Sequence, residues 1–251
     1  MYKGIDVSKY QGVIDWDAVK KAGLDFAILR CGYGTDLPSQ DDPYFERNVS
    51  ECDRLGIPYG VYLYSYALSI EDAHSEAKHV LRLLKNKKPS YPVYIDIEYD
   101  TYKNRHGITG KQLFTDIVKT FCEDLEADHY FVGWYTNKEF YEGYIYPEQL
   151  KAYTFWYARP HVSNPEKYGQ AISQTEIGTT GGHWAGINGA CDTDICSVDF
   201  PKIIKSKGFN GFDKTINQTN PTTVQPKPES VINVPDYYIV QSGDTLSGIA
   251  A

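Results

Sequence analysis

Short apolar runs alternate with longer amphipathic segments along most of the chain. Eight runs are rich in β-branched and aromatic residues, and we predict them to be strands. They are residues 4–7, 26–31, 59–66, 92–98, 130–135, 155–158, 171–175 and 191–195. Four longer segments with the helical period follow the early runs, at residues 15–22, 43–55, 70–84 and 111–125. Strands that alternate with helices are typical of a parallel sheet with crossover helices.

Eight such strands in a chain of this length predict an α/β fold, a TIM-like (β/α) barrel. The connections after residue 135 are shorter and less plainly helical than the early ones. We therefore expect the second half of the barrel to be irregular. An active site in this architecture lies at the carboxyl ends of the strands.

The pattern changes after Phe212. Residues 213–235 are rich in Pro, Thr, Asn, Gln and Lys and have no apolar period, which is typical of an extended linker. Residues 236–251 begin with an apolar Tyr-Tyr-Ile-Val run followed by Ser-Gly-Asp-Thr-Leu. We expect three parts, namely a barrel at 1–212, a linker at 213–235 and a short tail at 236–251.

Composition and charge narrow the functions that such a barrel could have. The chain has 25 basic and 33 acidic residues, a net charge of -8, which disfavours binding to nucleic acid or anionic lipid. The 22 tyrosines suit sugars, because a tyrosine offers an apolar face and a polar hydroxyl. The five cysteines are odd in number and lack C-x-x-C spacing, so we expect buried, reduced thiols. The six histidines show no ligand spacing, and we expect no metal and no cofactor.

Targeting signals are not evident at the start of the chain. Met1 is followed at once by the strand-like Tyr2, without a basic and then apolar leader, and no run of about 18 apolar residues occurs. We expect cytoplasmic synthesis without a signal peptide and no membrane insertion. A target outside the membrane is then reached only after another factor releases the protein.

Two carboxylates stand out in the fourth predicted strand. Asp96 and Glu98 lie two positions apart in Tyr-Ile-Asp-Ile-Glu, so their side chains share one face, while Ile95 and Ile97 face the outer layer. Crowded carboxylates repel as anions, which raises the pKa of one and keeps it protonated as a general acid. A solvated surface strand is the alternative, but the preceding Pro-Val-Tyr-Ile run is too apolar for it. The pair predicts glycosidase chemistry.

Further acids belong to the first and last predicted strands. Asp6 closes the first strand and Asp192 lies in the last, and these strands are neighbours in a barrel. Both side chains can therefore reach one mouth with Asp96 and Glu98. Each could instead be a helix cap or a turn former. Asp194 shares a face with Asp192, and strand periodicity cannot separate the two.

Six ordered motifs resemble those of glycoside hydrolase family 25, the lysozymes of the Chalaropsis type, which are common as phage endolysins and bacterial autolysins. The motifs span residues 4–12, 30–34, 60–65, 96–98, 156–159 and 186–192. The resemblance covers essentially all of residues 1–212. It implies a modified TIM-like (β/α) barrel of eight strands with an incomplete helical layer, which agrees with the weak helical pattern of the second half. The tail resembles the opening of a LysM module, which binds N-acetylglucosamine-containing glycans, but it is too short to form a competent binding domain.

The resemblance implies hydrolysis of the β-1,4 bond between N-acetylmuramic acid and N-acetylglucosamine in bacterial peptidoglycan. By the family motif, Glu98 is the general acid and Asp96 is the partner carboxylate, which orients the 2-acetamido group of the substrate. Asp6 and Asp192 correspond to two further acids that position sugars. Asp192 is preferred to Asp194 because its spacing from the preceding glycines fits the motif, although many relatives have Asp-Leu-Asn where this chain has Asp-Thr-Asp.

Five further residues are predicted to line a substrate groove. Four are aromatic residues near strand ends, for which core packing is the competing interpretation. They are Tyr62, Tyr64, Tyr135 and Trp156. Gln174 is the fifth, as a hydrogen-bonding group.

Two other functions remain open from the sequence. A chitinase-like N-acetylhexosaminidase also carries an Asp-x-Glu strand in a barrel, and the fold alone does not determine the substrate. A catalytically dead barrel that binds cell-wall glycans is the second alternative, which four intact acids disfavour. The sequence leaves the oligomeric state open.

Overall fold

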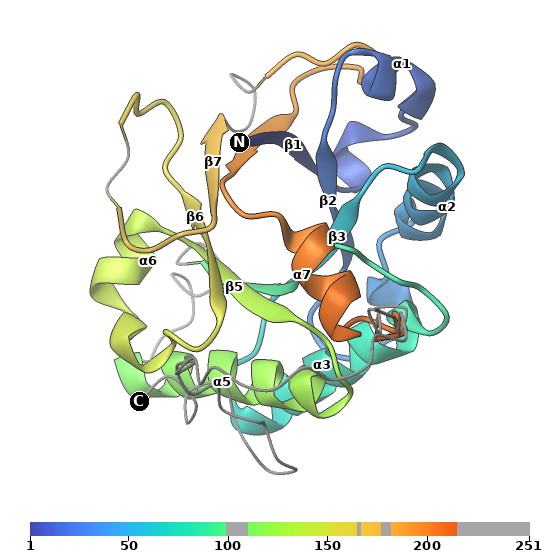
Figure 1. Ribbon diagram of the computed structural model, residues 1–251. Helices are drawn as coiled ribbons and strands as arrows, with labels where there is room; N and C mark the ends of the chain where they lie inside the picture. Colours follow the sequence, from blue (N-terminus) through green and yellow to red (C-terminus); the bar gives the residue numbers. More distant parts are fainter. Residues whose placement is uncertain (99–109, 165–166, 177–181, 215–251) are drawn as a thin grey trace, which may run out of the picture. The chain divides into compact units, whose positions relative to one another are not determined.

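Residues 1–98, 110–164, 167–176 and 182–214 are described by a computed structural model (Figure 1). Residues 1–214 form one compact unit built on a closed barrel, in which eight strands follow one another in sequence order. The strands are β1 (Tyr2–Val7), β2 (Phe26–Tyr33), β3 (Tyr59–Tyr64), β4 (Val93–Asp96), β5 (Val132–Asn137), β6 (Thr154–Ala158), β7 (Ile172–Glu176) and β8 (Asp192–Cys196). The predicted fold class and all eight predicted strands are confirmed. The predicted linker and tail lie outside the described residues, apart from the first two linker positions.

The direction of the last strand differs from the prediction. Strands β1 to β7 pair in parallel, whereas β8 is antiparallel to both β7 and β1. A strand runs parallel to its predecessor only after a crossover connection, and residues 182–191, the described part of the link before β8, contain no helix. As a result the first residue of β8, Asp192, lies at the end of the barrel where β1 to β7 finish.

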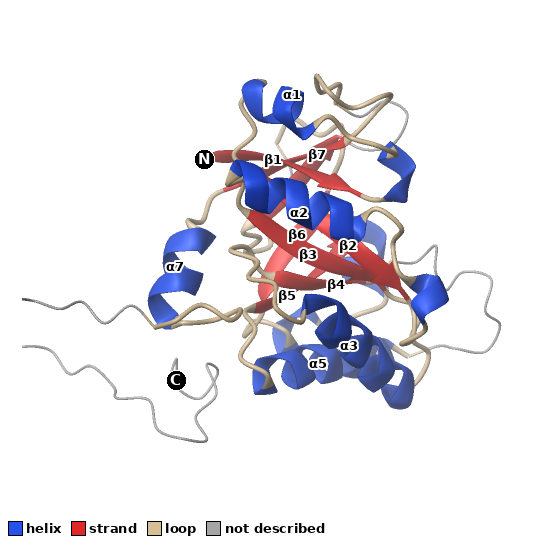
Figure 2. Cartoon of the chain, turned by 90° about the vertical axis from the view of Figure 1, so that its right-hand side faces the viewer, coloured by secondary structure: helices blue, strands red, loops and turns tan. Residues whose placement is uncertain are grey.

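Helices surround only part of the barrel (Figures 1 and 2). They are α1 (Trp16–Lys21), α2 (Phe45–Leu55), α3 (Ile70–Leu84), α5 (Lys111–Ala127), α6 (Lys138–Gly143) and α7 (Phe200–Lys207), with 3-10 turns η1 (Lys9–Gln11), η2 (Pro38–Gln40) and η3 (Pro147–Gln149). All four predicted helices are present. The described residues between β6 and β7 and between β7 and β8 contain no helix, so the incomplete helical layer is also confirmed.

Local sequence signals explain where the best-defined helices begin and end. The Ser69 side chain accepts a hydrogen bond from Asp72 N and caps α3. Helix α2 ends at Gly56, which has φ of 63° in the left-handed region that glycine enters without a Cβ clash.

None of the helices among the described residues is both long and apolar enough to cross a membrane.

Two apolar cores lie on the two sides of the barrel wall. Ile95 and Ile97 face outward and pack in the same core as Phe114 and Ile117 of α5, as their predicted orientation requires. The five cysteines are buried free thiols, which agrees with the prediction.

The inner core fills the barrel at the end where the parallel strands begin. Phe26 stacks on Tyr91 with ring centroids 4.5 Å apart, and Tyr91 meets Phe200 of α7 edge-on. Gly4 makes room for this packing, because a Cβ there would lie 2.2 Å from the Phe26 ring. Figure 2 shows α7 closing this end of the barrel. The opposite end is left open for a site.

Candidate active site

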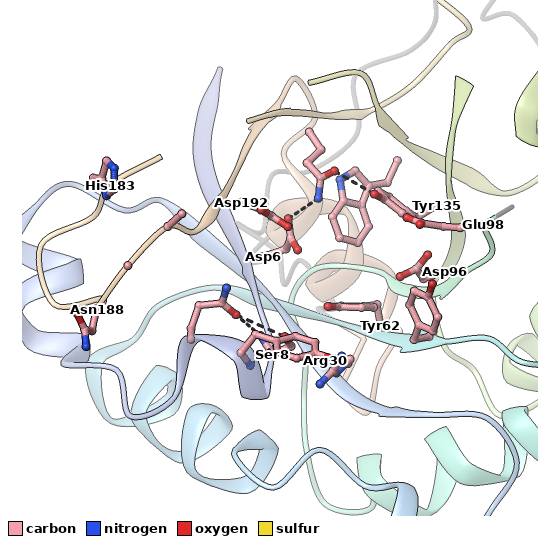
Figure 3. Close-up of a pocket in the computed structure, with 17 residues that line it drawn as sticks. Asp6, Ser8, Arg30, Tyr62, Asp96, Glu98, Tyr135, His183, Asn188 and Asp192 are labelled. Atoms are coloured by element: carbon pink, nitrogen blue, oxygen red, sulfur yellow. Dashed lines mark hydrogen bonds between the residues drawn. The ribbon is translucent and has the colours of Figure 1, made fainter. Parts of the chain in front are cut away.

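An open pocket of about 670 Å³ lies at the end of the barrel where β1 to β7 finish (Figure 3). All nine predicted site residues line it: Asp6, Tyr62, Tyr64, Asp96, Glu98, Tyr135, Trp156, Gln174 and Asp192. Eight further lining residues were not predicted to belong to the site: Ser8, Tyr10, Gln11, Arg30, His183, Asn188, Gly189 and Ala190. The barrel topology therefore brings every predicted residue to one cavity.

Asp96 is the last residue of β4 and is held firmly by its backbone. Its carbonyl oxygen accepts a hydrogen bond from Ser65 N at 2.8 Å, and the next amide, Ile97 N, donates to Tyr135 O at 3.1 Å. The Asp96 side chain is only 5% exposed, and its Oδ1 is buried without a hydrogen-bond partner among the described residues. Glu98 follows two residues later and is half-buried in the same pocket.

Burial and the neighbouring charge of Glu98 raise the pKa of Asp96 well above its ordinary value, although the Arg30 guanidinium opposes the shift. Two carboxyls in one buried site cannot both be ionised at low cost, so they titrate as a coupled pair. The Asp96–Glu98 pair therefore retains a proton at a pH where isolated carboxyls have lost theirs. A retained proton is what general acid catalysis requires.

Asp6 is fixed by a chain of hydrogen bonds across the barrel mouth. Gln174 Nε2 donates to Asp6 Oδ2 at 2.8 Å, and Tyr135 OH donates to Gln174 Oε1 at 2.9 Å. This chain joins β7 to β1 and to β5. Gln174 is only 3% exposed, so its side chain orients Asp6 from within the wall.

The structure places Asp192 and Asp194 at different depths in the barrel. Asp192 is half-buried, lies beside Asp6 in the strand register and lines the pocket. Asp194 is fully buried one layer deeper, opposite Gly4, and its Oδ1 accepts a hydrogen bond from Trp156 Nε1 at 2.8 Å. Strand periodicity gives both side chains one face but does not say which lies at the mouth.

Asp6 and Asp194 form a second coupled pair beneath the mouth. The Oδ2 atom of Asp194 is buried without a hydrogen-bond partner among the described residues, so an ionised carboxylate is disfavoured there. Burial is the largest cause that raises the pKa of each group, and the charge of Asp192 raises both further. The folded protein therefore binds a proton here that the unfolded chain releases.

We expect Asp194→Asn to stabilise the protein at neutral pH. A carboxyl whose pKa is raised on folding costs stability above its unfolded pKa, and the cost grows as pH rises towards the folded pKa. Asparagine keeps the acceptor for Trp156 and does not titrate, so a gain of about 1–2 kcal/mol is expected at pH 7. Thermal melts from pH 4 to pH 8 should show the gain only at the higher pH values. Asp213→Asn, at an exposed position, is the control, and a variant that melts below the parent at pH 7 would contradict the account.

The aromatic residues form the floor of the pocket. The Trp156 ring is 1% exposed and lies 4.4 Å from the Tyr135 ring and 5.8 Å from the Tyr62 ring, centroid to centroid. Trp156, Tyr62 and Tyr135 thus belong to the inner core and also line the pocket. Tyr64 is half-buried on the same strand as Tyr62 and lines the side of the cavity.

Arg30 was not predicted as a site residue. It lies in β2, is 8% exposed, and its Nε donates to Asp42 Oδ2 at 2.8 Å. Asp42 is itself 5% exposed and also accepts hydrogen bonds from Lys9 N and Tyr44 N. An arginine inside the otherwise apolar run Phe-Ala-Ile-Leu-Arg-Cys was a signal for a buried, partnered charge.

No cluster of three or more side chains suited to holding a metal ion occurs in the described parts of the chain. The described residues that line the pocket offer paired carboxyls beside aromatic side chains.

Comparison with known proteins identifies the family of the chain. The family model for "Glycosyl hydrolases family 25" matches residues 5–180, which is most of the barrel. The chain belongs to glycosyl hydrolase family 25. The matched segment of this family 25 domain includes Asp6, Asp96 and Glu98 and ends before Asp192.

Relatives and solved structures of the family resemble the chain at modest identity. The autolytic lysozyme of Clostridium acetobutylicum is 25% identical over 195 residues, which is 76% of this chain and 55% of that protein. The modular autolysin LytC of Streptococcus pneumoniae has a TM-score of 0.67 and 29% identity over 77% of this chain and 46% of LytC. A family 25 glycosyl hydrolase of Bacillus anthracis has a TM-score of 0.60 at 24% identity, covers 84% of this chain and 93% of its own, and supports the fold. This chain thus spans about half the length of the first two proteins.

Proposed function

We propose that the family 25 domain is a muramidase, a lysozyme that hydrolyses the β-1,4 bond between N-acetylmuramic acid and N-acetylglucosamine in peptidoglycan. The observation that carries the proposal is the buried Asp96–Glu98 pair at the open end of the barrel. Its relatives include an autolytic lysozyme, and LytC has been solved in complex with a synthetic peptidoglycan ligand. Glycan strands of the bacterial wall are the partner that fits this pocket.

In the proposed mechanism Glu98 donates its proton to the glycosidic oxygen as the bond breaks. Before substrate binds, burial favours a proton on Asp96, and the coupled pair shares it. For Glu98 to act as the acid, the proton of the pair lies on Glu98 when the bond begins to break. The ionised Asp96 is then favoured by the positive charge that develops on the sugar. Asp96 orients and stabilises the 2-acetamido group as its oxygen attacks the anomeric carbon and displaces the protonated leaving oxygen. Water then opens the cyclic intermediate at the anomeric carbon and returns a proton to Glu98, which completes the hydrolysis.

The other acids and aromatic residues are proposed to hold the sugars. Asp6, oriented by Gln174, and Asp192 present carboxyl oxygens to sugar hydroxyls at the mouth. Tyr62, Tyr64 and Tyr135 offer ring edges and hydroxyls to the same sugars. Trp156 closes the floor beneath them.

Digestion of purified peptidoglycan and chitin side by side tests the assignment. A muramidase solubilises peptidoglycan and leaves chitin intact, whereas a chitinase-like enzyme does the reverse. Binding to the wall without release of soluble fragments would support the catalytically dead alternative. No observation in the structure favours either alternative, because all four acids are present in one pocket.

The proposed setting is the cell wall, in turnover or in host-cell lysis, after release of a cytoplasmically made protein. We also propose that residues 213–235 act as a linker and that residues 236–251 begin a LysM-type glycan-binding segment. These segments lie outside the described residues, except for Asp213 and Lys214.

Deletion of residues 215–251 is expected to leave hydrolysis of short soluble glycan fragments unchanged within about twofold, because residues 1–214 form a compact unit that contains the whole pocket. Attachment of a complete glycan-binding module should instead raise activity on intact walls, since tethering makes the second contact intramolecular. Initial rates on both substrates check this. A deletion that slowed hydrolysis of short fragments would show that the tail contributes to the barrel or the groove.

A further inference from the structure

The segment that carries the Asp96–Glu98 pair is held differently at its two ends. Asp96 ends β4, and its carbonyl oxygen accepts a hydrogen bond from Ser65 N, which follows β3. The next amide, Ile97 N, donates to Tyr135 O of β5. The registers of β4 with β3 and with β5 both finish at Asp96. Glu98 lies beyond this point, so the sheet does not fix its backbone in the way that it fixes Asp96.

One side chain of β5 extends the support by a further peptide unit. Thr136 Oγ1 donates a hydrogen bond to Ile97 O. That carbonyl belongs to the planar peptide that contains the Glu98 nitrogen. The bond therefore restricts the rotation of this peptide, and with it the direction in which the Glu98 side chain leaves the backbone.

Thr136 is itself firmly placed. Its side chain is buried, and the residue pairs in register with Tyr157 of β6. The next residue, Asn137, caps α6 by accepting a hydrogen bond from Phe140 N at 3.0 Å. A β-branched side chain in a strand also has few rotamers, so the hydroxyl stays where it meets Ile97 O.

Packing alone gives no reason for a hydroxyl at this position. Thr136 shares the outward face of β5 with Trp134, whose ring stacks on Phe155 in the outer core with centroids 4.2 Å apart. Valine has nearly the same shape and would bury no polar side-chain atom there. A hydroxyl is buried at low cost only where it finds a partner, and here the partner is the carbonyl next to Glu98.

We propose that Thr136 is a positioning residue for the general acid: its hydroxyl holds the peptide between residues 97 and 98 so that the Glu98 carboxyl meets the glycosidic oxygen. The inference rests on the proposed muramidase function and deepens it. Thr136 does not line the pocket, so its effect on the reaction passes through the backbone of Glu98. A displacement of about 1 Å at a reacting group can cost about a hundredfold in rate.

Thr136→Val removes the hydroxyl and keeps the branched shape. We expect kcat on peptidoglycan strands of defined length to fall about tenfold and KM to stay within about twofold, because the groove that binds the glycan is unchanged. Thr136→Ser keeps the donor on a side chain that rotates more freely, and should retain at least about a third of the parent kcat. Thr115→Val is the matched control and should leave kcat unchanged. Thr115 is equally buried and donates to Lys111 O at 2.6 Å within α5, but does not line the pocket or contact β4 through this bond.

A second substrate distinguishes a displaced acid from a damaged fold. The dinitrophenyl β-glycoside of an N-acetylglucosaminyl-N-acetylmuramic acid disaccharide releases a stable phenolate, which needs no proton from Glu98. Thr136→Val should therefore lower kcat on this glycoside by less than about twofold, and Glu98→Gln should also lose far less on it than on strands. A partly unfolded variant loses equally on both substrates, so the ratio of the two kcat values reports the position of the acid.

A Thr136→Val protein whose ratio of kcat on strands to kcat on the glycoside equals that of the parent overturns the inference, whether its kcat is unchanged or reduced on both. Parent activity on the strands would still uphold the proposed function in that case. A parent enzyme that cuts neither substrate would instead defeat the proposed function.

Discussion

Replacement of Glu98 by glutamine is expected to lower the turnover of peptidoglycan by about a thousandfold or more. The amide keeps the size and polarity of the side chain but has no proton of suitable acidity to give to the leaving oxygen. Because Glu98 lies after β4 and is half-buried, the exchange should leave the barrel intact. Release of soluble muropeptides measures turnover, and the melting temperature reports the fold.

Glu148→Gln is a matched control for this prediction. Glu148 lies in η3, is exposed and lines a different pocket, so the same exchange there should not alter turnover. Binding of the Glu98→Gln protein to insoluble walls should persist, because the subsites remain. Turnover within tenfold of the parent would remove Glu98 from the role of general acid.

Replacement of Asp96 by asparagine is expected to lower turnover by about a hundredfold or more. Asp96 is buried beside Glu98, and in the proposed mechanism its negative charge stabilises the developing positive charge in a site largely shielded from water. Asparagine preserves the shape and removes the charge. Measurement of kcat on defined glycan strands, where substrate is saturating, isolates this loss from any change in binding.

The pH profile of Asp96→Asn gives an independent check of the coupling. In the parent protein, repulsion between the two carboxylates helps the pair to retain its proton as pH rises. Without Asp96 that repulsion is lost, so the fall in activity at alkaline pH should begin at a lower pH than in the parent.

For the kcat prediction, an effect of Asp96→Asn below about tenfold, or roughly 1.4 kcal/mol, would shift the main electrostatic role to Asp6 or Asp192.

The barrel could be predicted from the sequence because inward-facing and outward-facing residues differ in polarity and alternate along each strand. Each strand carries alternating inward and outward residues, as in β4, where Ile95 faces the helices and Asp96 faces the pocket. This alternation is the same whichever way a strand runs, however, so the antiparallel direction of β8 could not be derived from it. Direction depends on the length and structure of the connection before the strand.

The predicted site residues came from strand ends, where the barrel topology brings side chains together. Asp192 and Asp194 could not be distinguished by alternation, because depth within the barrel is set by strand register and not by period. Tyr10 was missed because it belongs to a short 3-10 turn outside any strand. Arg30 was missed although its position within an apolar run pointed to a buried charge, which Asp42 satisfies from a distant loop.

The central claim is that the enzyme cuts on the muramic acid side of the glycosidic bond. The direct measurement is reduction of the products of peptidoglycan digestion with borohydride, followed by identification of the sugar alcohol at each new end. We predict that the new reducing ends are N-acetylmuramic acid, recovered as its alcohol, and that Glu98→Gln forms none. Recovery of N-acetylglucosaminitol in its place would contradict the muramidase assignment.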